Sequence, residues 1–177
     1  MSAPDPWRIV HSEASLGWGG QEHRILAELT GFQRRGAWTA LLAPEQSVIF
    51  ERAQAAGIIV RHLDTKKIRY PINAFRLKRW LRENEVQVVN THSSRDGYVV
   101  GAAARLARTP LLIRSRHIDV TYPNRWASRH AFTSLADHVV TTSQKITHHL
   151  RETFQLAEDR VTTVPTGIEL ETFTPDG

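Results

Sequence analysis

The chain has 177 residues and no cysteine, so it has the length of one domain and excludes disulfides and thiolate metal sites. It contains no apolar run near the roughly 20 residues that span a bilayer and no signal-peptide core, so we expect a soluble, cytoplasmic protein. Its formal net charge of +5 favours a polyanionic partner, either nucleic acid, an anionic membrane or a phosphorylated substrate, although many bacterial domains are basic for no site-specific reason.

Short apolar runs alternate with amphipathic segments of helical length along the whole chain. Alternation of this kind predicts right-handed βαβ crossovers and a mainly parallel sheet, so we expect an α/β, Rossmann-like three-layer domain. The predicted strands are Trp7–His11, Trp38–Ala43, Ile58–Leu63, Val86–Thr91, Leu111–Ser115, Val139–Thr142 and Val161–Val164. The predicted helices are Gln21–Arg35, Gln46–Ala56, Ala74–Glu83, Gly97–Ala107, Asn124–Leu135 and Gln144–Phe154. Gly36 and Gly57 stand where two of these helices are expected to end.

The final segment, residues 165–177, differs from the rest of the chain. It holds two prolines and two glycines, and its apolar residues are widely spaced. This composition is typical of a linker that leaves a finished domain. We therefore expect one domain at residues 1–164 and an interdomain linker at 165–177, with a second domain absent from this chain.

Ligands of an open parallel sheet bind beyond the carboxyl ends of the strands, so the loops after the first, fourth and fifth strands are the candidate sites. The first loop contains Gly17, Gly19 and Gly20, which let the backbone turn tightly and approach a ligand. The helix that follows offers unpaired N–H groups, which suit a phosphate. The glycine spacing is not G-x-G-x-x-G, so it does not support a dinucleotide site, and the loop could equally serve only to turn the chain.

The fourth strand ends in a run of polar residues, Asn90–Gly97 (NTHSSRDG), which leads into a helix. Such a run at the carboxyl end of a strand is hard to explain by packing, so His92, Ser93 and Ser94 are candidate ligand contacts. Ser94 or Asp96 could instead cap the following helix.

The fifth strand ends in Arg114–Asp119 (RSRHID), in which a histidine is flanked by arginines. Arg116 and His117 could contact sugar hydroxyls or a phosphate, and His117 could transfer a proton. Spacing alone does not separate these roles from that of a hydrogen-bonded loop histidine. The adjacent His148 and His149 lack the spacing of a zinc pair on a helix, so no metal site is expected.

Basic residues concentrate between residues 61 and 82. They are Arg61, Lys66, Lys67, Arg69, Arg76, Lys78, Arg79 and Arg82. The large apolar residues among them are Phe75, Leu77, Trp80 and Leu81. This mixture suits contact with an anionic membrane surface or a phosphorylated lipid, and a solvated helix with its apolar residues on the core is the alternative. Nucleic acid is not an expected partner, because aromatic residues are few here and no helix-turn-helix or RNA-binding motif is present.

Four segments in a fixed order carry a resemblance to a known family. They are Gly19–Glu22 (GGQE) before a helix, Val88–Pro110 with THS at a strand end, Asp137–Ser143 (DHVVTTS), and Val164–Pro175 (VPTGIELETFTP). Together they resemble the N-terminal domain of the family-four retaining glycosyltransferases of GT-B architecture, over nearly the whole chain. Thr166 departs from the asparagine that is usual at that position of the family.

The resemblance implies that the complete enzyme transfers a sugar from a nucleotide-sugar donor to a glycan or lipid-linked acceptor, with retention of configuration and without a metal or other cofactor. It implies that Gly19 and Gly20 approach the donor phosphates and that His117 is the catalytic contact to the sugar. The remaining expected contacts to acceptor or sugar are His92, Ser93, Ser94, Arg116 and Ser143. The donor-binding domain lies outside this chain, so we expect the chain alone to have negligible transferase activity.

The expected pathway is lipopolysaccharide or surface polysaccharide synthesis, which is the commonest use of the family. The basic segment would then place the protein peripherally on the inner face of the membrane. One alternative is a nucleotide-sugar epimerase of the same architecture, which acts on the donor without an acceptor. Another is a non-catalytic basic binding module. A Rossmann dehydrogenase shares the fold class, but its glycine fingerprint is lacking here.

Overall fold

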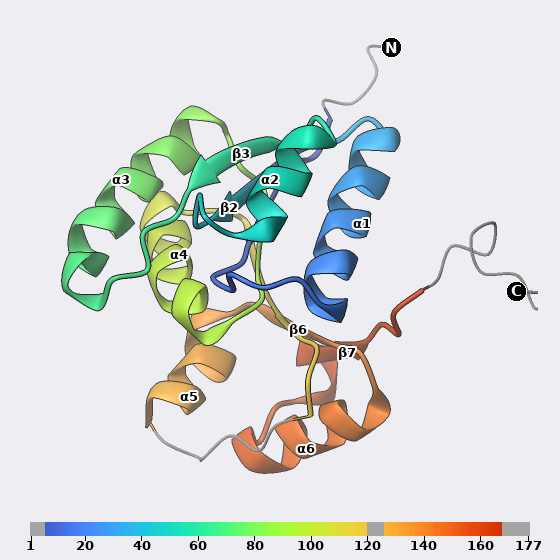
Figure 1. Ribbon diagram of the computed structural model, residues 1–177. Coiled ribbons are helices and arrows are strands. Elements are labelled where there is room, and N and C mark those ends of the chain that lie inside the picture. The colour runs from blue at the N-terminus through green and yellow to red at the C-terminus, as the bar shows by residue number, and fades with distance from the viewer. Residues whose placement is uncertain (1–5, 120–125, 168–177) are drawn as a thin grey trace, which may run out of the picture.

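The computed structural model describes residues 6–119 and 126–167, and its strands form one seven-stranded sheet (Figure 1). The strands are β1 (Arg8–Ser12), β2 (Trp38–Ala43), β3 (Ile59–His62), β4 (Val88–Thr91), β5 (Leu111–Arg116), β6 (His138–Thr141) and β7 (Val161–Thr163). Their order is β3-β2-β1-β4-β5-β6-β7, and every neighbouring pair is parallel. The predicted α/β, Rossmann-like fold with a parallel sheet is confirmed.

Helices follow the strands in the alternation that the sequence predicts. The α-helices are α1 (Gly20–Arg34), α2 (Val48–Ala55), α3 (Tyr70–Glu83), α4 (Ser94–Ala107), α5 (Trp126–His130) and α6 (Gln144–Phe154). The short helices are η1 (Lys67–Arg69), the π-helical η2 (Ala131–Leu135) and η3 (Glu158–Arg160). Within the described part of the chain, no helix is long and apolar enough to cross a membrane.

Helices cover both faces of the sheet, which gives three layers (Figure 1). On one face, α3 and α4 pack on a core cluster that includes Val10 and Val89 of the central strands. On the other face, α1 and α2 pack on Leu41 and Ala43 of β2. Near β6 and β7, a third apolar cluster joins η2 and α6 to the sheet. Successive strand residues point to opposite faces, and strands buried on both faces therefore read in the sequence as continuous apolar runs.

A proline and a capping box explain where two helices begin earlier than predicted. The first residue of α3 is Tyr70, and Pro71 lies in its first turn, where the missing proline N–H leaves no hydrogen bond unmade. The first residue of α4 is Ser94, because Ser93 and Asp96 form a reciprocal capping box at its N-terminus. The predicted capping role is therefore confirmed for Asp96 but not for Ser94, because the N-cap is Ser93.

The predicted helix at residues 124–135 is divided in the structure. Residues 124 and 125 lie outside the described residues, α5 covers 126–130, and the chain continues as the π-helical η2. Gly101 of α4 leaves room for Leu135 at the end of η2, because a Cβ on Gly101 would lie 2.8 Å from the Leu135 side chain. Beyond β7, residues 165–167 have no regular structure and 168–177 lie outside the described residues, so the predicted linker stays a prediction.

Candidate active site

A cavity of about 740 Å³ opens where the order of the strands reverses, between β1 and β4. Ligands of open α/β sheets bind at such a switch point, beyond the carboxyl ends of the strands. The walls of the cavity come from the first loop, the start of α4 and the end of β5, and they include Glu13, Gly20, His92, Arg116 and His117. The three loops that the sequence indicates therefore meet in one cavity.

The predicted serine contacts differ in their relation to this cavity. Ser93 and Ser94 line it at the start of α4. Ser143 directly follows Thr142, which lines the cavity. Ser143 is the N-cap of α6, and the Ser143 hydroxyl accepts a hydrogen bond from the Ile146 N–H at 3.3 Å. The structure thus accounts for Ser143 as a capping residue, and its contact with a ligand stays a prediction.

The two glycines predicted to contact the donor phosphates, Gly19 and Gly20, also differ in position. Gly19 is the N-cap of α1, and its N–H donates to the Glu22 carboxylate at 2.9 Å. Gly20 lines the cavity, with open space where a Cβ would be. Because Glu22 places a negative charge at the same helix end, it competes with a bound phosphate for the helix N–H groups. Gly20 is therefore the better-placed of the two predicted phosphate contacts.

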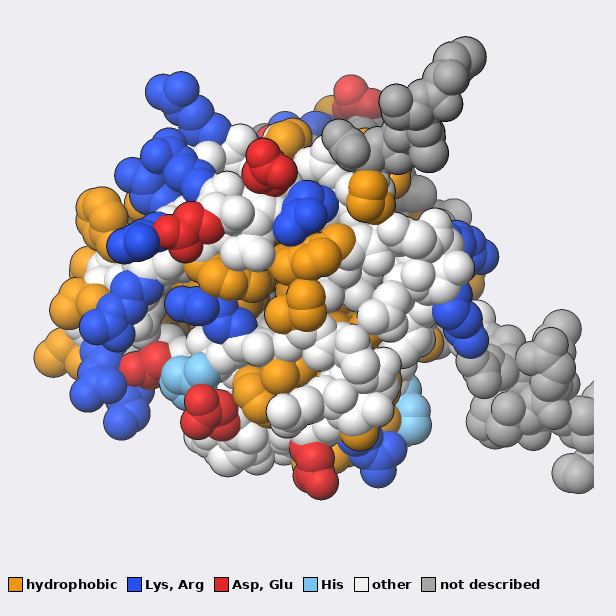
Figure 2. All heavy atoms as spheres, turned by 90° about the horizontal axis from the view of Figure 1, so that it is seen from above, with side chains coloured by type: hydrophobic (Ala, Val, Ile, Leu, Met, Phe, Trp, Pro, Cys, Tyr) orange, Lys and Arg blue, Asp and Glu red, His pale blue; other side chains and the backbone are white. Residues whose placement is uncertain are grey.

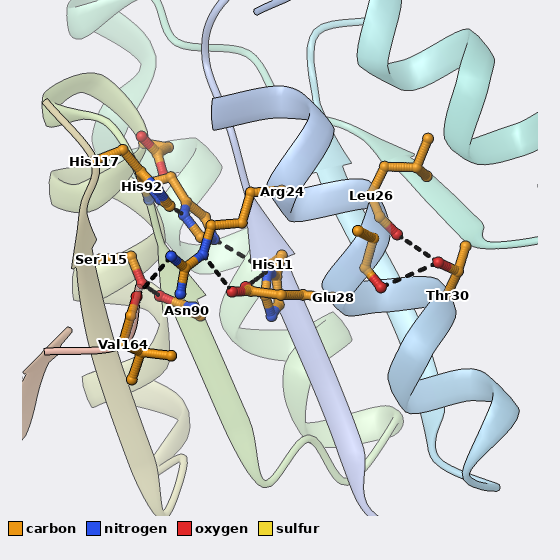
Figure 3. Close-up of polar contacts among 12 residues, drawn as sticks. His11, Arg24, Leu26, Glu28, Thr30, Asn90, His92, Ser115, His117 and Val164 are labelled. Atoms are coloured by element: carbon orange, nitrogen blue, oxygen red, sulfur yellow. Dashed lines mark hydrogen bonds and ion pairs between the residues drawn. The ribbon is translucent and has the colours of Figure 1, made fainter. Parts of the chain in front are cut away.

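Three histidines run from the cavity into the core of the protein (Figure 3). Nε2 of His117 lies 2.8 Å from Nδ1 of His92, and Nε2 of His92 lies 3.0 Å from Nδ1 of His11. His11 belongs to β1, whereas His92 directly follows β4 and His117 directly follows β5. They meet because neighbouring parallel strands end at the same edge of the sheet.

Burial keeps these histidines neutral at physiological pH. It lowers the pKa of His11 to about 3 and that of His117 to about 4, and it holds the pKa of His92 well below its usual value. The positive charge of Arg24 lowers all three pKa values further, and that of Arg114 adds to the effect on His92. A neutral imidazole has one N–H and one acceptor nitrogen, so the two links of the chain can both be hydrogen bonds.

Two charged residues of α1, Arg24 and Glu28, lie next to His11 (Figure 3). Oε2 of Glu28 lies 3.8 Å from Nδ1 of His11, and Oε1 accepts a hydrogen bond from Nε of Arg24 at 2.7 Å. Nη1 of Arg24 donates to the Val164 carbonyl at 2.8 Å and to the Thr166 hydroxyl at 3.1 Å. Arg24 thereby ties α1 to the segment that leaves β7, and Thr166 also lines the cavity.

A buried carboxylate, Asp96, holds the first turn of α4 against β1. It accepts hydrogen bonds from the Ser12 hydroxyl at 2.5 Å, the His92 N–H at 3.0 Å and the Ser93 N–H at 2.9 Å. Burial raises the pKa of Asp96, while these hydrogen bonds act in the opposite direction. Asp96 thus fixes the backbone on which His92 stands.

A second buried carboxyl, Glu13, lines the cavity directly after β1. It accepts hydrogen bonds from the Ala14 N–H at 2.7 Å and the Ser15 N–H at 2.8 Å, and from the side-chain amide of Gln21. Burial, with the nearby charge of Asp96, raises the pKa of Glu13 to about 7. Glu13 can therefore hold or release a proton in the cavity near neutral pH.

Sequence reasoning missed His11, Glu13 and Arg24. His11 lies inside a predicted strand, and its contact with His92 spans 81 residues, so no local signal indicates it. Arg24 lies on a predicted helix and has the pattern of a solvent-exposed residue. Glu13 could have been found, because a carboxyl at the end of the first strand of such a sheet faces the ligand side.

Within the described residues, one group of potential metal ligands has donor atoms close together. His11, Glu28 and His92 each offer an atom within 4.8 Å of the others. Glu28 is already paired with Arg24, so a cation here would meet no uncompensated negative charge. The arrangement fits neutral hydrogen-bonded histidines better than a cation, and we assign no metal ligand.

The predicted basic surface lies along η1 and α3, where Figure 2 shows apolar and basic side chains mixed at the edge of the molecule. Lys66, Arg69, Arg76 and Arg79 are exposed and Lys78 is half-buried, whereas the side chain of Lys67 lies outside the described part of the chain. Two of these residues have acidic partners: Arg69 contacts Asp64 at 3.2 Å and Arg79 contacts Glu83 at 2.6 Å.

The two sides of α3 differ, and the predicted membrane contact stays a prediction. Leu77 and Leu81 are buried in the core, as in an ordinary amphipathic helix. Ile68 of η1 is 90% exposed, however, and Ile72 and Phe75 of α3 are 58% and 62% exposed. Exposed apolar side chains among basic ones are typical of an interfacial surface. We call Lys66, Ile68, Arg69, Ile72, Phe75, Arg76, Lys78 and Arg79 the α3 surface.

The α3 surface adjoins the candidate active site. Arg95 lines the active-site cavity and also a neighbouring hollow of about 380 Å³ that Lys66 and Arg69 line. The part of the α3 surface that Lys66 and Arg69 form is therefore next to the cavity.

The parallel sheet with a cavity at its switch point defines a Rossmann-like domain. The chain belongs to Glycosyltransferase Family 4, whose sequence model matches residues 18–172. The family and the fold together make the protein a glycosyltransferase domain. A search of the curated proteins finds no match to the chain.

Solved structures with this fold include glycosyltransferases. A glycosyltransferase from Rickettsia africae matches with a TM-score of 0.80 and 16% identity, over 97% of this chain and 46% of its own. The Anabaena protein Alr3699/HepE, in complex with UDP-glucose, matches with a TM-score of 0.76 and 13% identity, over 96% and 47%. The lipopolysaccharide outer core galactosyltransferase WaaB matches with a TM-score of 0.70 and 13% identity, over 93% and 46%. The fold is that of the N-terminal half of a GT-B enzyme, and the chain spans about half the length of these structures.

Proposed function

We propose that this chain is the acceptor-side domain of an enzyme that transfers a sugar, with retention, from a nucleotide-sugar donor to a glycan or lipid-linked acceptor. The observation that carries the proposal is the switch-point cavity of a family-four chain, where Gly20, Arg116 and His117 face one space. HepE is solved with UDP-glucose, which supports a nucleotide sugar as the donor.

Sugar transfer requires that the donor sugar and the acceptor be held in position and that positive potential stabilise the leaving diphosphate. The bond from C1 of the sugar to the diphosphate breaks, a bond from C1 to the acceptor oxygen forms on the same face, and the hydroxyl proton passes to the leaving phosphate. Arg116 and the N-terminus of α1 beside Gly20 would stabilise the leaving diphosphate. His117 is neutral near pH 7, so it would bind the sugar through a hydrogen bond rather than as a cationic acid.

The proposal is tested on the complete enzyme by the dependence of product formation on donor and acceptor. We expect transfer only when both are present. His117→Ala is expected to lower kcat/KM about 100-fold, the usual cost of removing a well-placed hydrogen-bonding group. His148→Ala, at an exposed histidine of α6, is the matched control and is expected to have no effect. Epimerisation of the donor without an acceptor would favour the epimerase instead.

Activity of the 177-residue chain by itself is a second test of the proposed division of labour. The cavity has walls from this domain alone, and the proposed enzyme needs a second domain to hold the donor. We expect negligible turnover by the chain. Turnover above that of an empty-vector control would contradict the proposed division of labour between two domains.

We further propose that the enzyme acts in lipopolysaccharide or surface polysaccharide synthesis, peripherally on the cytoplasmic face of the membrane. The fold shared with WaaB supports the pathway, and the exposed Ile68, Ile72 and Phe75 among basic residues support the membrane contact. Each Lys or Arg near an anionic surface contributes about 1 kcal/mol of binding free energy. The same surface adjoins the cavity, where a lipid-linked acceptor would enter.

Co-sedimentation with vesicles tests this contact. We expect the protein to bind vesicles that contain anionic lipid and to bind them more weakly as the salt concentration rises. We expect the double variant Ile72→Ser, Phe75→Ser not to bind. Leu106→Ser, at an exposed leucine of α4, is the control and should leave binding unchanged. Binding that does not depend on lipid charge, or that survives the double variant, would contradict the proposal.

A further inference from the structure

A groove connects the candidate active site with the α3 surface. The active-site cavity shares Ala14 and Arg95 with the neighbouring hollow of about 380 Å³, which we call the middle hollow. The middle hollow in turn shares Leu63 and Arg69 with an outer hollow of about 700 Å³, which Ile72 of α3 also lines. Because each hollow shares walls with the next, the three form one continuous groove from the cavity to α3.

Hydrogen bonds hold the walls of the middle hollow together. The Asp64 carbonyl accepts a hydrogen bond from the side-chain amide of Asn73 at 3.0 Å, and the Asp64 carboxylate accepts one from the Lys66 N–H at 2.9 Å. The Tyr70 hydroxyl donates to the Arg95 carbonyl at 3.3 Å. The segment between β3 and α3 is therefore joined to the start of α4, and the hollow between them is a built part of the fold.

The middle hollow is positively charged. Lys66, Arg69 and Arg95 line it, and all three are exposed. Asp64 also lines it and pairs with Arg69 at 3.2 Å; hydrogen bonds from the Lys66 N–H and from Arg69 lower the pKa of Asp64, so this carboxyl is ionised near pH 7. None of the described acidic residues forms an ion pair with Lys66 or Arg95. Three positive charges and one negative charge leave a net charge of +2.

Three kinds of surface follow one another along the groove. The cavity at its inner end is lined by hydrogen-bonding groups such as Ser93 and His117, which suit the hydroxyls of a sugar. The middle hollow is cationic, and the α3 surface beyond it exposes Ile68, Ile72 and Phe75. This order, polar then cationic then apolar, is the order of the groups in a sugar that a phosphate joins to a lipid. An acceptor without phosphate would leave the two unpaired cations facing no anion.

We propose that Lys66, Arg69 and Arg95 bind the phosphate of an acceptor in which a phosphate or diphosphate joins a sugar to a lipid. The sugar then lies in the active-site cavity, and the lipid lies against Ile72 and Phe75. Arginine can donate two hydrogen bonds to one phosphate, and lysine adds a compact positive charge. The inference rests on the function proposed above and narrows its acceptor to a lipid-phosphate-linked sugar.

Titration of the 177-residue chain with geranyl diphosphate tests the site, because this probe carries both a diphosphate and an apolar chain. We expect geranyl diphosphate to bind more tightly than inorganic pyrophosphate, which lacks the lipid, and more tightly than geraniol, which lacks the phosphates. Isothermal titration calorimetry measures the three dissociation constants. A geranyl diphosphate that binds no more tightly than either of the other two probes would overturn the proposal.

Variants separate the two halves of the probe. Lys66→Gln, Arg95→Gln is expected to weaken the binding of both geranyl diphosphate and pyrophosphate about 10-fold, as for two exposed charge contacts. Ile72→Ser, Phe75→Ser should weaken only the binding of geranyl diphosphate. Arg34→Gln, at an exposed arginine in the last turn of α1, is the matched control and should have no effect. An equal loss in Arg34→Gln, or none in Lys66→Gln, Arg95→Gln, would contradict a specific phosphate site.

NMR of the ¹⁵N-labelled chain locates the bound probe. On addition of geranyl diphosphate, we expect the largest shifts of the backbone amide signals at Lys66, Arg69 and Arg95. The amide signals of Gly20 and Gln21, at the proposed donor-phosphate site, should change less. Larger changes at Gly20 and Gln21 would place the probe at the donor site and overturn the proposal.

Kinetics of the complete enzyme distinguish this inference from the proposed function. We expect a lower KM for a sugar joined to a lipid through diphosphate than for the same sugar on a lipid without phosphate. Lys66→Gln, Arg95→Gln should raise the first KM more than the second. Equal KM values for the two acceptors would reject the phosphate site and leave the transferase function intact. Probe binding as expected, with no transfer to any acceptor, would reject the proposed function alone.

Discussion

Single residues set the shape of the candidate site, and Gly97 in α4 is the most constrained of them. A Cβ at this position would lie 2.0 Å from Nη1 of Arg114. Arg114 is buried, and its guanidinium also lies 4.7 Å from the centre of the Phe132 ring, so it has little room to withdraw. The glycine therefore allows the first turn of α4 to close on β5 beside the cavity.

Gly97→Ala is expected to destabilise the protein by about 1–3 kcal/mol, the usual cost of forcing an extra carbon into a packed site. Gly31→Ala is the matched control in α1, where the new Cβ would lie 3.6 Å from the exposed end of Arg35. There we expect stabilisation of about 0.5–1 kcal/mol, because alanine favours the helix. Urea unfolding followed by tryptophan fluorescence measures both, and equal effects would contradict the packing argument.

Glu13 is expected to make stability depend on pH. Its pKa rises from 4.5 in the unfolded chain to about 7 in the folded protein, so the folded state binds the proton more tightly. The contribution to stability is complete below pH 4.5 and is lost as the pH rises to 7, with a size on the order of 3 kcal/mol.

Glu13→Gln removes this titration. The free energy of unfolding, measured by urea titration between about pH 4.5 and 8, should fall more steeply in the wild type than in Glu13→Gln. Because Asp96 interacts with Glu13, the difference between the two curves reports on the Glu13 carboxyl together with its interaction with Asp96. Parallel curves would show that the carboxyl is not shifted.

At the scale of elements, helix caps and ligand contacts compete for the same positions. Ser47, Ser93 and Ser143 are the N-caps of α2, α4 and α6, and each follows the carboxyl end of a strand. In a βα unit the loop that faces the ligand is also the loop that begins the helix. A polar residue there satisfies either requirement, which is why the sequence alone predicted Ser93 and Ser143 only as ligand contacts although both are helix caps.

Ser143→Ala and Ser143→Asp separate them experimentally. The loss of the cap in Ser143→Ala is expected to cost about 1 kcal/mol of stability, while aspartate caps as well as serine and should restore it. If Ser143 only caps α6, the complete enzyme should keep its KM values in both variants. A raised KM in Ser143→Asp with normal stability would instead support the predicted contact with a ligand.

At the scale of the whole molecule, Arg24 connects parts that lie far apart in the sequence. It pairs with Glu28 in α1 and reaches the carbonyl of Val164, 140 residues away, just beyond β7. The same side chain lowers the pKa of the buried histidines. The position of the segment after β7 and the electrostatics of the cavity therefore depend on one arginine.

Arg24→Gln is expected to raise the pKa of His117 above its value of about 4, because a positive charge that opposes protonation is removed. Arg24→Lys is the control, since it keeps the charge but not the forked geometry, and should leave the pKa closer to the wild-type value. NMR titration of the histidine ring protons measures the shift. A lower pKa in Arg24→Gln than in the wild type would contradict the electrostatic role of Arg24.

Much of the fold could be predicted because its signals are local. The apolar runs identify the strands, and Gly36, with φ +86°, ends α1 in the left-handed conformation that the sequence predicts for a glycine there. The histidine chain could not be predicted in the same way. His11 pairs in register with Asn90, and a slip of one residue between β1 and β4 would turn its side chain to the other face of the sheet.

The sequence by itself determined the α/β alternation, the C-terminal ends of most helices and the family motifs, because these depend on periodicity and on the backbone preferences of neighbouring residues. Only the tertiary structure decided that His11 joins His92 and His117, and that Ile72 and Phe75 face solvent while Leu77 faces the core. The physical reason is that strand register and the choice of the buried helix face are set by packing across the whole domain, which no local segment encodes.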